Sequence, residues 1–380
     1  MPFISSLNLR TRQDSSWRVT FSVLLTLVFC VFSAHVCRAQ TDTVTADKYA
    51  LYLPSHMTAR ALGGLFTSVT VAGHRLVAVG ERGRIILSDD NGVSWRQVET
   101  PTSVTLAHVT FATPTDGWAV GGMGLVLHST DGGLSWTKQF DGTQAAAVAL
   151  AAAQADIQHS GSNDLTTANL QSAQSMVSAG PSVPFLDAYA ISADDVMIAG
   201  AFGMAFASMD GGVHWQSLAD FLPNPNGLHI YQILRDNGNF AVAGEQGLLL
   251  YGPPDKPLPT ITSSFQGTLF GETFAKDHSW IVFGLQGTIM RSTDQGAQWM
   301  IASAGQPVGI DCGITLNDGD VVLGNEAGQL LISHDNGQTY RITTVNEPVV
   351  GLAQAADGTL IAVGPNGPRR IPLDKLAAGV

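Results

Sequence analysis

The sequence predicts an all-β fold, a seven-bladed β-propeller whose blades each have four antiparallel strands. Glycine is abundant, with 41 among 380 residues, which disfavours a helical bundle because glycine inside a helix costs about 1 kcal/mol. Hydrophobic residues make up 45% and charged residues only 13%, a composition too apolar for a disordered chain. A pattern of about 40 residues also recurs along the chain, and four short strands per repeat of this length are typical of a propeller blade.

The repeat joins an apolar strand, a G-x-x-G turn, a second apolar strand and the motif S-x-D-x-G-x-x-W. Five copies span residues 77–95, 118–136, 196–215, 280–299 and 321–340, while shorter copies at 240–255 and 360–373 keep the first half. The leading glycines are Gly80, Gly121, Gly200, Gly244, Gly284, Gly324 and Gly364, with spacings of 41, 79, 44, 40, 40 and 40 residues. Seven units with one insertion account for residues 61–380, whereas a solenoid would need capping repeats and gives no reason for seven.

The S-x-D-x-G-x-x-W motif has a structural interpretation. Its aspartate falls in a tight turn between the third and fourth strands, where the carboxylate can accept hydrogen bonds from its own turn. The following glycine permits a positive φ, and the aromatic residue can pack between blades. We therefore interpret ten residues as structural: Asp90, Trp95, Asp131, Trp136, Asp210, Trp215, Asp294, Trp299, Asp335 and Tyr340. No metal site is expected, because residues 89–92 (DDNG) lack the glutamate that completes a calcium loop.

This motif is the Asp-box, or BNR repeat, of sialidases, some glucanases, sorting receptors and the photosystem II stability and assembly factors. Over roughly residues 60–370 the chain most resembles the assembly factors, which are exported seven-bladed propellers of similar size. The resemblance implies a propeller without an enzymatic role that helps a membrane complex assemble by binding a protein. The sequence departs from that family in its acidic, arginine-poor composition, since the assembly factors resemble binders with an arginine patch, and in carrying an insertion.

Residues 1–39 are expected to be a signal peptide. The apolar run 19–34 follows three arginines, and small residues precede a cut after Ala39. An uncleaved N-terminal anchor is the alternative, although the run is short for a spanning helix. We expect a periplasmic or secreted protein.

Export changes the charge and the cysteine content. Without residues 1–39, 15 basic and 30 acidic side chains remain, so the formal charge moves from −12 to −15 and nucleic-acid binding is not expected. Only Cys312 remains, which excludes an internal disulfide. Its apolar, glycine-containing surroundings predict a buried, inert thiol.

The candidate binding site is a ring of turns. Blade topology places the Asp-box turns on one face, and the G-x-x-G turns and the connections between blades on the other. A ring of unlike residues on a regular scaffold favours binding of a protein partner, and ordinary solvated turns are the alternative. The candidate residues are Glu81, Arg82, Met123, Phe202, Glu245, Gln246, Gln286 and Glu326, with Asn325 and Glu326 taken as the variable pair of the sixth blade.

Two segments lie outside the regular repeat. Residues 141–182 form the insertion between the second and third blades, where AAAVALAAAQA favours helix and the remainder resembles a flexible polar linker. The insertion is either a lid or partner-docking arm, or a tolerated, partly disordered loop. Residues 40–60 form an N-terminal segment, in which we expect Thr43–Leu53 to supply the missing outer strand of the last blade.

No catalytic residue and no cofactor are predicted. A sialidase would need three arginines around one carboxylate, and only Arg82 falls in the ring of turns. Glu81, Glu245 and Glu326 share that face, which keeps a carbohydrate-active protein, either a glycoside hydrolase or a glycan-binding module, as the alternative. The main hypothesis is a monomeric, exported scaffold that binds a protein partner in a membrane-associated complex such as an envelope transporter.

Overall fold

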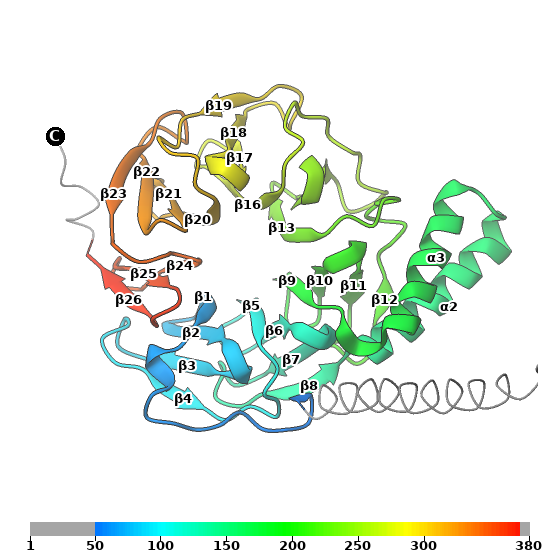
Figure 1. The fold of residues 1–380 in the computed structure, drawn as a ribbon, viewed down its shortest axis with the longest axis horizontal. Coiled ribbons are helices and arrows are strands. Elements are labelled where there is room, and N and C mark those ends of the chain that lie inside the picture. Colours follow the sequence, from blue (N-terminus) through cyan, green and yellow to red (C-terminus); the bar gives the residue numbers. More distant parts are fainter. Residues whose placement is uncertain (1–49, 373–380) are drawn as a thin grey trace, which may run out of the picture. The chain divides into compact units, whose positions relative to one another are not determined.

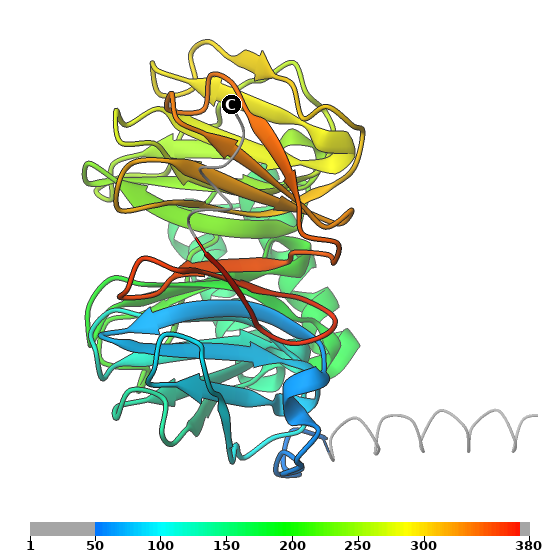
Figure 2. The same cartoon turned by 90° about the vertical axis from the view of Figure 1, so that its left-hand side faces the viewer.

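The computed structural model describes residues 50–372, which form a β-propeller of seven antiparallel sheets (Figure 1). The inner strands of neighbouring sheets contact one another in the order β1, β5, β9, β13, β16, β20, β24 and back to β1. Figure 2 shows the ring from the side, with the last blade against the first. The propeller predicted from the repeat is therefore confirmed.

Each blade follows the chain from its inner to its outer strand. The first three blades comprise β1 (Phe66–Ala72), β2 (Arg75–Gly80), β3 (Ile85–Ser88) and β4 (Arg96–Val98); β5 (Leu106–Phe111), β6 (Gly117–Gly121), β7 (Leu125–Ser129) and β8 (Thr137–Phe140); and β9 (Phe185–Ala190), β10 (Val196–Gly200), β11 (Ala205–Ser208) and β12 (Gln216–Ser217). The other four comprise β13 (Ile230–Asp236), β14 (Asn239–Gly244) and β15 (Leu249–Gly252); β16 (Leu269–Phe274), β17 (Trp280–Gly284), β18 (Ile289–Ser292) and β19 (Met300–Ala302); β20 (Ile310–Thr315), β21 (Val321–Asn325), β22 (Gln329–Ser333) and β23 (Arg341–Thr344); and β24 (Gly351–Gln354), β25 (Leu360–Val363) and β26 (Arg369–Ile371).

The fourth and seventh blades have three strands in the described chain, not the four expected of every blade. These are the blades whose repeats lack the Asp-box. In the fourth blade, Pro253 and Pro254 follow β15, and proline cannot donate a hydrogen bond to a sheet. One isolated bridge, Leu250 to Thr260, takes the place of a fourth strand there.

The N-terminal segment does not complete the last blade over its described residues. Instead, residues 50–60 run beside the first blade and its connection to the second. The amide of Ser55 donates to the Thr100 carbonyl at 3.0 Å, and the amide of Ser103 donates to the Ala50 carbonyl at 3.0 Å. Leu51 is buried in the hydrophobic cluster between these two blades. The expected closing strand is thus wrong for residues 50–53, and residues 43–49 lie outside the described chain.

The Asp-box turns are closed by their own side chains. In the second blade, Ser129 Oγ accepts from the amide of Gly133 at 2.9 Å and donates to Asp131 Oδ1 at 2.8 Å. Trp136 Nε1 then donates to the Gly133 carbonyl at 3.0 Å while its ring packs between the first two blades. In the first blade, the hydroxyl and amide of Ser94 and the hydroxyl of Ser88 lower the pKa of Asp90 to about 2.

The insertion is a helical hairpin. Helix α2 (Gly142–Ser160) begins at a capping box formed by Asp141 and Gln144, and α3 (Asp164–Ala179) begins at one formed by Asn163 and Thr166. The flexible linker expected after the alanine-rich stretch is therefore replaced by a second helix. Figure 1 shows the hairpin beside β12, the short outer strand of the third blade. Among the described helices, none combines the length and hydrophobicity that crossing a membrane requires.

Candidate functional site

The G-x-x-G turns share one backbone geometry. The second variable residue has a positive φ of 52° to 59° at Arg82, Met123, Phe202, Gln246 and Gln286. The amide of the first variable residue donates to the carbonyl before the inner strand of the same blade, as from Glu81 to Leu65 at 3.1 Å. These bonds hold each turn beside the start of its blade. We call the face of the propeller that carries these turns the G-x-x-G face.

The turn of the sixth blade is offset by one residue from the expected alignment. Asn325 pairs with Ile310 in the sheet, as Gly284 pairs with Leu269 in the fifth blade. The amide of Glu326 donates to the Gly309 carbonyl at 3.2 Å, so Glu326 takes the first variable position. The variable pair is thus Glu326 and Ala327 rather than Asn325 and Glu326, because the sequence GNEAG contains one residue more than G-x-x-G.

The three glutamates of the ring each interact with groups of their own blade. Glu81 forms a 2.8 Å ion pair with Arg84 in the first blade. Glu245 accepts from the amide of His229 at 3.1 Å in the fourth. In the sixth blade, burial and the charge of Glu326 raise the pKa of Asp311 to about 7.

The exposed ring residues differ in character. Arg82, Gln246 and Gln286 are exposed polar side chains, whereas Met123 is half-buried against the cluster between the first two blades. Phe202 is 56% exposed, although it is apolar and lies in a left-handed turn. Arg82, Met123, Gln246 and Gln286 share this backbone conformation, so the feature that distinguishes Phe202 from them is its exposed aromatic ring.

Phe202 begins a row of rings that crosses the G-x-x-G face toward the centre. Its ring meets His229 edge to face at 5.0 Å between centroids, His229 lies 6.3 Å from Tyr231, and Tyr231 lies 5.6 Å from Phe270. All four rings are at least partly exposed. His229, Tyr231 and Phe270 were not among the predicted binding residues, because the row joins three blades and no sequence motif marks it.

The row ends at a central channel of about 470 Å³, lined by all seven inner strands. Asp187 is 3% exposed there, lies 3.0 Å from His108 Nδ1 and accepts from the amide of Ile233 at 2.7 Å. Burial lowers the pKa of His108, but the charge of Asp187 raises it by more, so the net shift is upward. Burial raises the pKa of the Cys312 thiol, which donates to the Val349 carbonyl at 3.5 Å. The described residues contain no cluster of three potential metal ligands.

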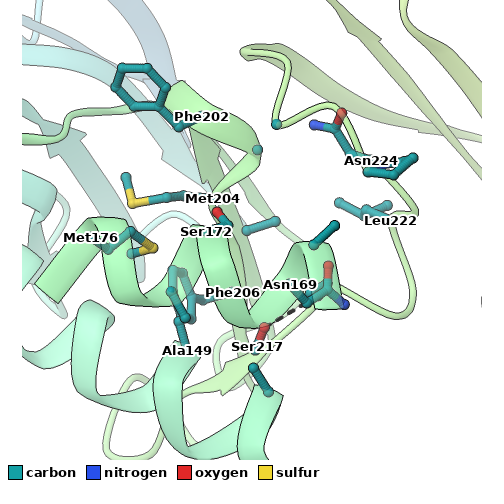
Figure 3. Close-up of a pocket in the computed structure, with 18 of the residues that line it drawn as sticks. Ala149, Asn169, Ser172, Met176, Phe202, Met204, Phe206, Ser217, Leu222 and Asn224 are labelled. Carbon is teal, nitrogen blue, oxygen red and sulfur yellow. Dashed lines mark hydrogen bonds between the residues drawn. The ribbon is translucent and has the colours of Figure 1, made fainter. Parts of the chain in front are cut away.

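A second hollow adjoins Phe202 on its outer side. The hairpin packs its small residues and Met176 against the third blade, where Val183, Phe185 and Phe206 are buried. Between α3 and the connection from the third to the fourth blade lies a groove of about 390 Å³, continuous with a narrower pocket under the hairpin. Figure 3 shows Phe202, Met204 and Met176 around one end of this pocket.

Comparisons with known proteins support the architecture and the repeat. Residues 87–160 match the family model described as Photosynthesis system II assembly factor YCF48. A structure described as YCF48 bound to D1 peptide has a TM-score of 0.60 at 17% identity, covering 83% of this chain and 94% of that chain. YCF48 from Cyanidioschyzon merolae has a TM-score of 0.59 at 14% identity, covering 83% and 97%.

The fold is also shared outside that family. The WD40 β-propeller domain of Doa1 has a TM-score of 0.58 at 11% identity, covering 84% of this chain and 95% of that one. At such low identities the solved structures show the fold alone. No curated protein matches the sequence.

Proposed function

We propose that this Asp-box propeller, which resembles the photosystem II assembly factors, is a non-catalytic exported scaffold that binds a protein partner on its G-x-x-G face. It serves as an assembly or accessory factor for a membrane-associated complex such as an envelope transporter. The observation that carries the proposal is the row of Phe202, His229, Tyr231 and Phe270, because partly exposed aromatic side chains are enriched at protein interfaces. A YCF48 bound to D1 peptide provides a precedent for a protein ligand on this fold.

An arginine patch would bind a negatively charged partner, whereas the charge of this chain favours a positively charged one. Only Arg82 supplies a basic side chain among the proposed contact residues, while Glu81, Glu245 and Glu326 lie in the same ring of turns. The residues after position 39 carry a formal charge of −15. Electrostatic complementarity therefore favours a partner surface with a net positive charge.

Replacing Glu81, Glu245 and Glu326 by glutamine tests the scaffold against the carbohydrate-active alternative. Loss of these charges is expected to weaken partner capture from solubilised membranes, with no glycan hydrolysis by the native protein for the variant to lose. The readouts are quantitative mass spectrometry of the captured proteins and release of reducing sugar. Glycan turnover by the native protein that the triple variant lacks would establish the hydrolase instead.

Export is part of the proposal and has its own measurement. Cleavage after Ala39 gives a mature chain that begins at Gln40. Intact-mass analysis of protein from the periplasm or culture medium is expected to show this N-terminus. A membrane-bound product that retains residues 1–39 would establish the anchor, and a cytoplasmic product would contradict export.

A further inference from the structure

The groove beside Phe202 combines an apolar surface with an opening to solvent. Its lining includes Met176 and Ala179 of α3, Val183, Phe202 and Pro225. Its volume of about 390 Å³ falls in the range of roughly 300–1,000 Å³ typical of ligand pockets. The groove can therefore hold one or two large apolar side chains against Phe202 and Met176.

The pocket that continues this groove under the hairpin has an acidic end. Asp156 of α2 lines this pocket, as does Asn169, whose side-chain amide donates to Asp220 Oδ1 at 3.5 Å. Burial and the charge of Asp220 raise the pKa of Asp156, while His159 acts in the opposite direction. In Figure 3, Asn169 and Phe202 lie at opposite ends of the pocket, so the apolar and acidic ends are separate.

The chain around the groove supplies no cation with a fixed charge. Residues 139–234, which include the whole hairpin and the third blade, contain eight aspartates and neither lysine nor arginine. The like charges of the half-buried Asp156 and the exposed Asp220 repel each other, and a cation from another molecule would relieve that repulsion. The missing basic side chains point to a partner that brings them.

We propose that this groove docks a segment of a protein partner that combines large apolar and basic side chains. One or two apolar side chains fill the hollow between Phe202 and Met176, and a lysine or arginine pairs with Asp156 and Asp220. The inference rests on the proposed scaffold function and assigns it a site, with the hairpin as one wall of that site. An anionic lipid surface does not fit, because the carboxylates would repel it.

The probe for this proposal is a fluorescein-labelled 14-residue peptide of leucines and lysines with helical spacing. Its two counterparts replace the lysines by glutamates or the leucines by serines. Binding of each peptide to the mature chain is measured by fluorescence anisotropy at low and at high salt. We expect the leucine–lysine peptide to bind at least about tenfold more tightly than either counterpart, and more weakly at high salt.

Two variants with matched controls locate the binding. Phe202→Asn removes the apolar contact and keeps a residue that tolerates positive φ, and Gln295→Asn places an asparagine at a positive-φ position outside the site, in the Asp-box turn of the fifth blade. Asp156→Asn with Asp220→Asn removes the acidic end, and Asp194→Asn neutralises one exposed carboxylate elsewhere in the third blade. The two groove variants are expected to weaken binding about tenfold, the acidic one also losing salt dependence, while both controls bind as the native chain does.

Several results would overturn the proposal. They are no measurable binding to the native chain, binding to Phe202→Asn within twofold of native, and equal binding of the leucine–glutamate peptide. Equal binding of n-hexylamine would identify a small-amine site instead. If the native chain captures a membrane protein from source cells and the Asp156→Asn, Asp220→Asn double variant captures it equally, the groove assignment fails while the scaffold function stands. If the native chain captures none, the scaffold function itself fails.

Discussion

The hydrogen bonds of one serine side chain stabilise each Asp-box turn. Ser129 is 2% exposed and accepts the buried amide of Gly133 at 2.9 Å. Ser129→Ala leaves that amide without a partner, which is expected to cost about 1–3 kcal/mol of unfolding free energy. Ser178→Ala is the control, because that exposed hydroxyl only donates to a carbonyl within α3. Denaturant unfolding compares the two, and equal loss in both would contradict a structural role for the serine.

Asp311 is expected to make stability depend on pH. Burial and then Glu326 raise its pKa to about 7, and Oδ2 is buried without a hydrogen-bond partner. The unfolded carboxyl has a pKa of about 3.9, so the folded state binds the extra proton and loses stability as the pH rises from about 4 to 7.

Asp311→Asn should therefore raise the unfolding free energy at pH 8 by about 1–2 kcal/mol, allowing for partial solvent screening, with the gain vanishing toward pH 4. Asp255→Asn, at an exposed carboxylate, controls for the change in net charge. Thermal melts from pH 4 to pH 8 provide the measurement. A gain that is the same at both ends of this range would show that the Asp311 charge is not its cause.

The N-terminal segment acts through the blades that it contacts. Leu51 is 3% exposed among Val98, Val104 and Trp136, while Leu53 is 52% exposed. Leu51→Ala is expected to lower the unfolding free energy by about 2–5 kcal/mol, and Leu53→Ala to leave it nearly unchanged. Thermal denaturation of the two variants tests this placement. A stable Leu51→Ala variant would mean that the segment does not hold the first two blades together.

The strands and turns of the blades could be predicted because short local motifs determine them. The G-x-x-G and Asp-box spacings identified the blades, because each turn requires particular residues within a few positions. Helix α3 was missed because its sequence is polar and its capping residues, Asn163 and Thr166, are a weak signal without a partner helix. Its burial comes from α2 and from the third blade, where Met176 belongs to the hydrophobic cluster of that blade. The hollow beside Phe202 depends on that packing and could not be read from the sequence.

The propeller ring closes without a strand from the described part of the N-terminal segment. The last blade packs its inner strands against β1, with Ile361 and Val363 in one cluster with Phe66 and Leu76. The repeat predicted seven blades, but ring closure depends on contacts between the two ends of the propeller, which a local motif does not encode. The acidic charge and the aromatic row together distinguish this propeller from one built around an arginine patch.

The proposed function depends on the binding of a protein partner to the G-x-x-G face. Its most direct test is affinity capture of the mature chain from solubilised membranes of its source cells, with quantitative mass spectrometry and site-specific photo-crosslinking at the exposed positions Arg82, Gln246 and Gln286. We expect the same protein to be captured and to be crosslinked from these positions, and not from Val93 on the Asp-box face. Capture of no protein, or crosslinking only from Val93, would contradict it.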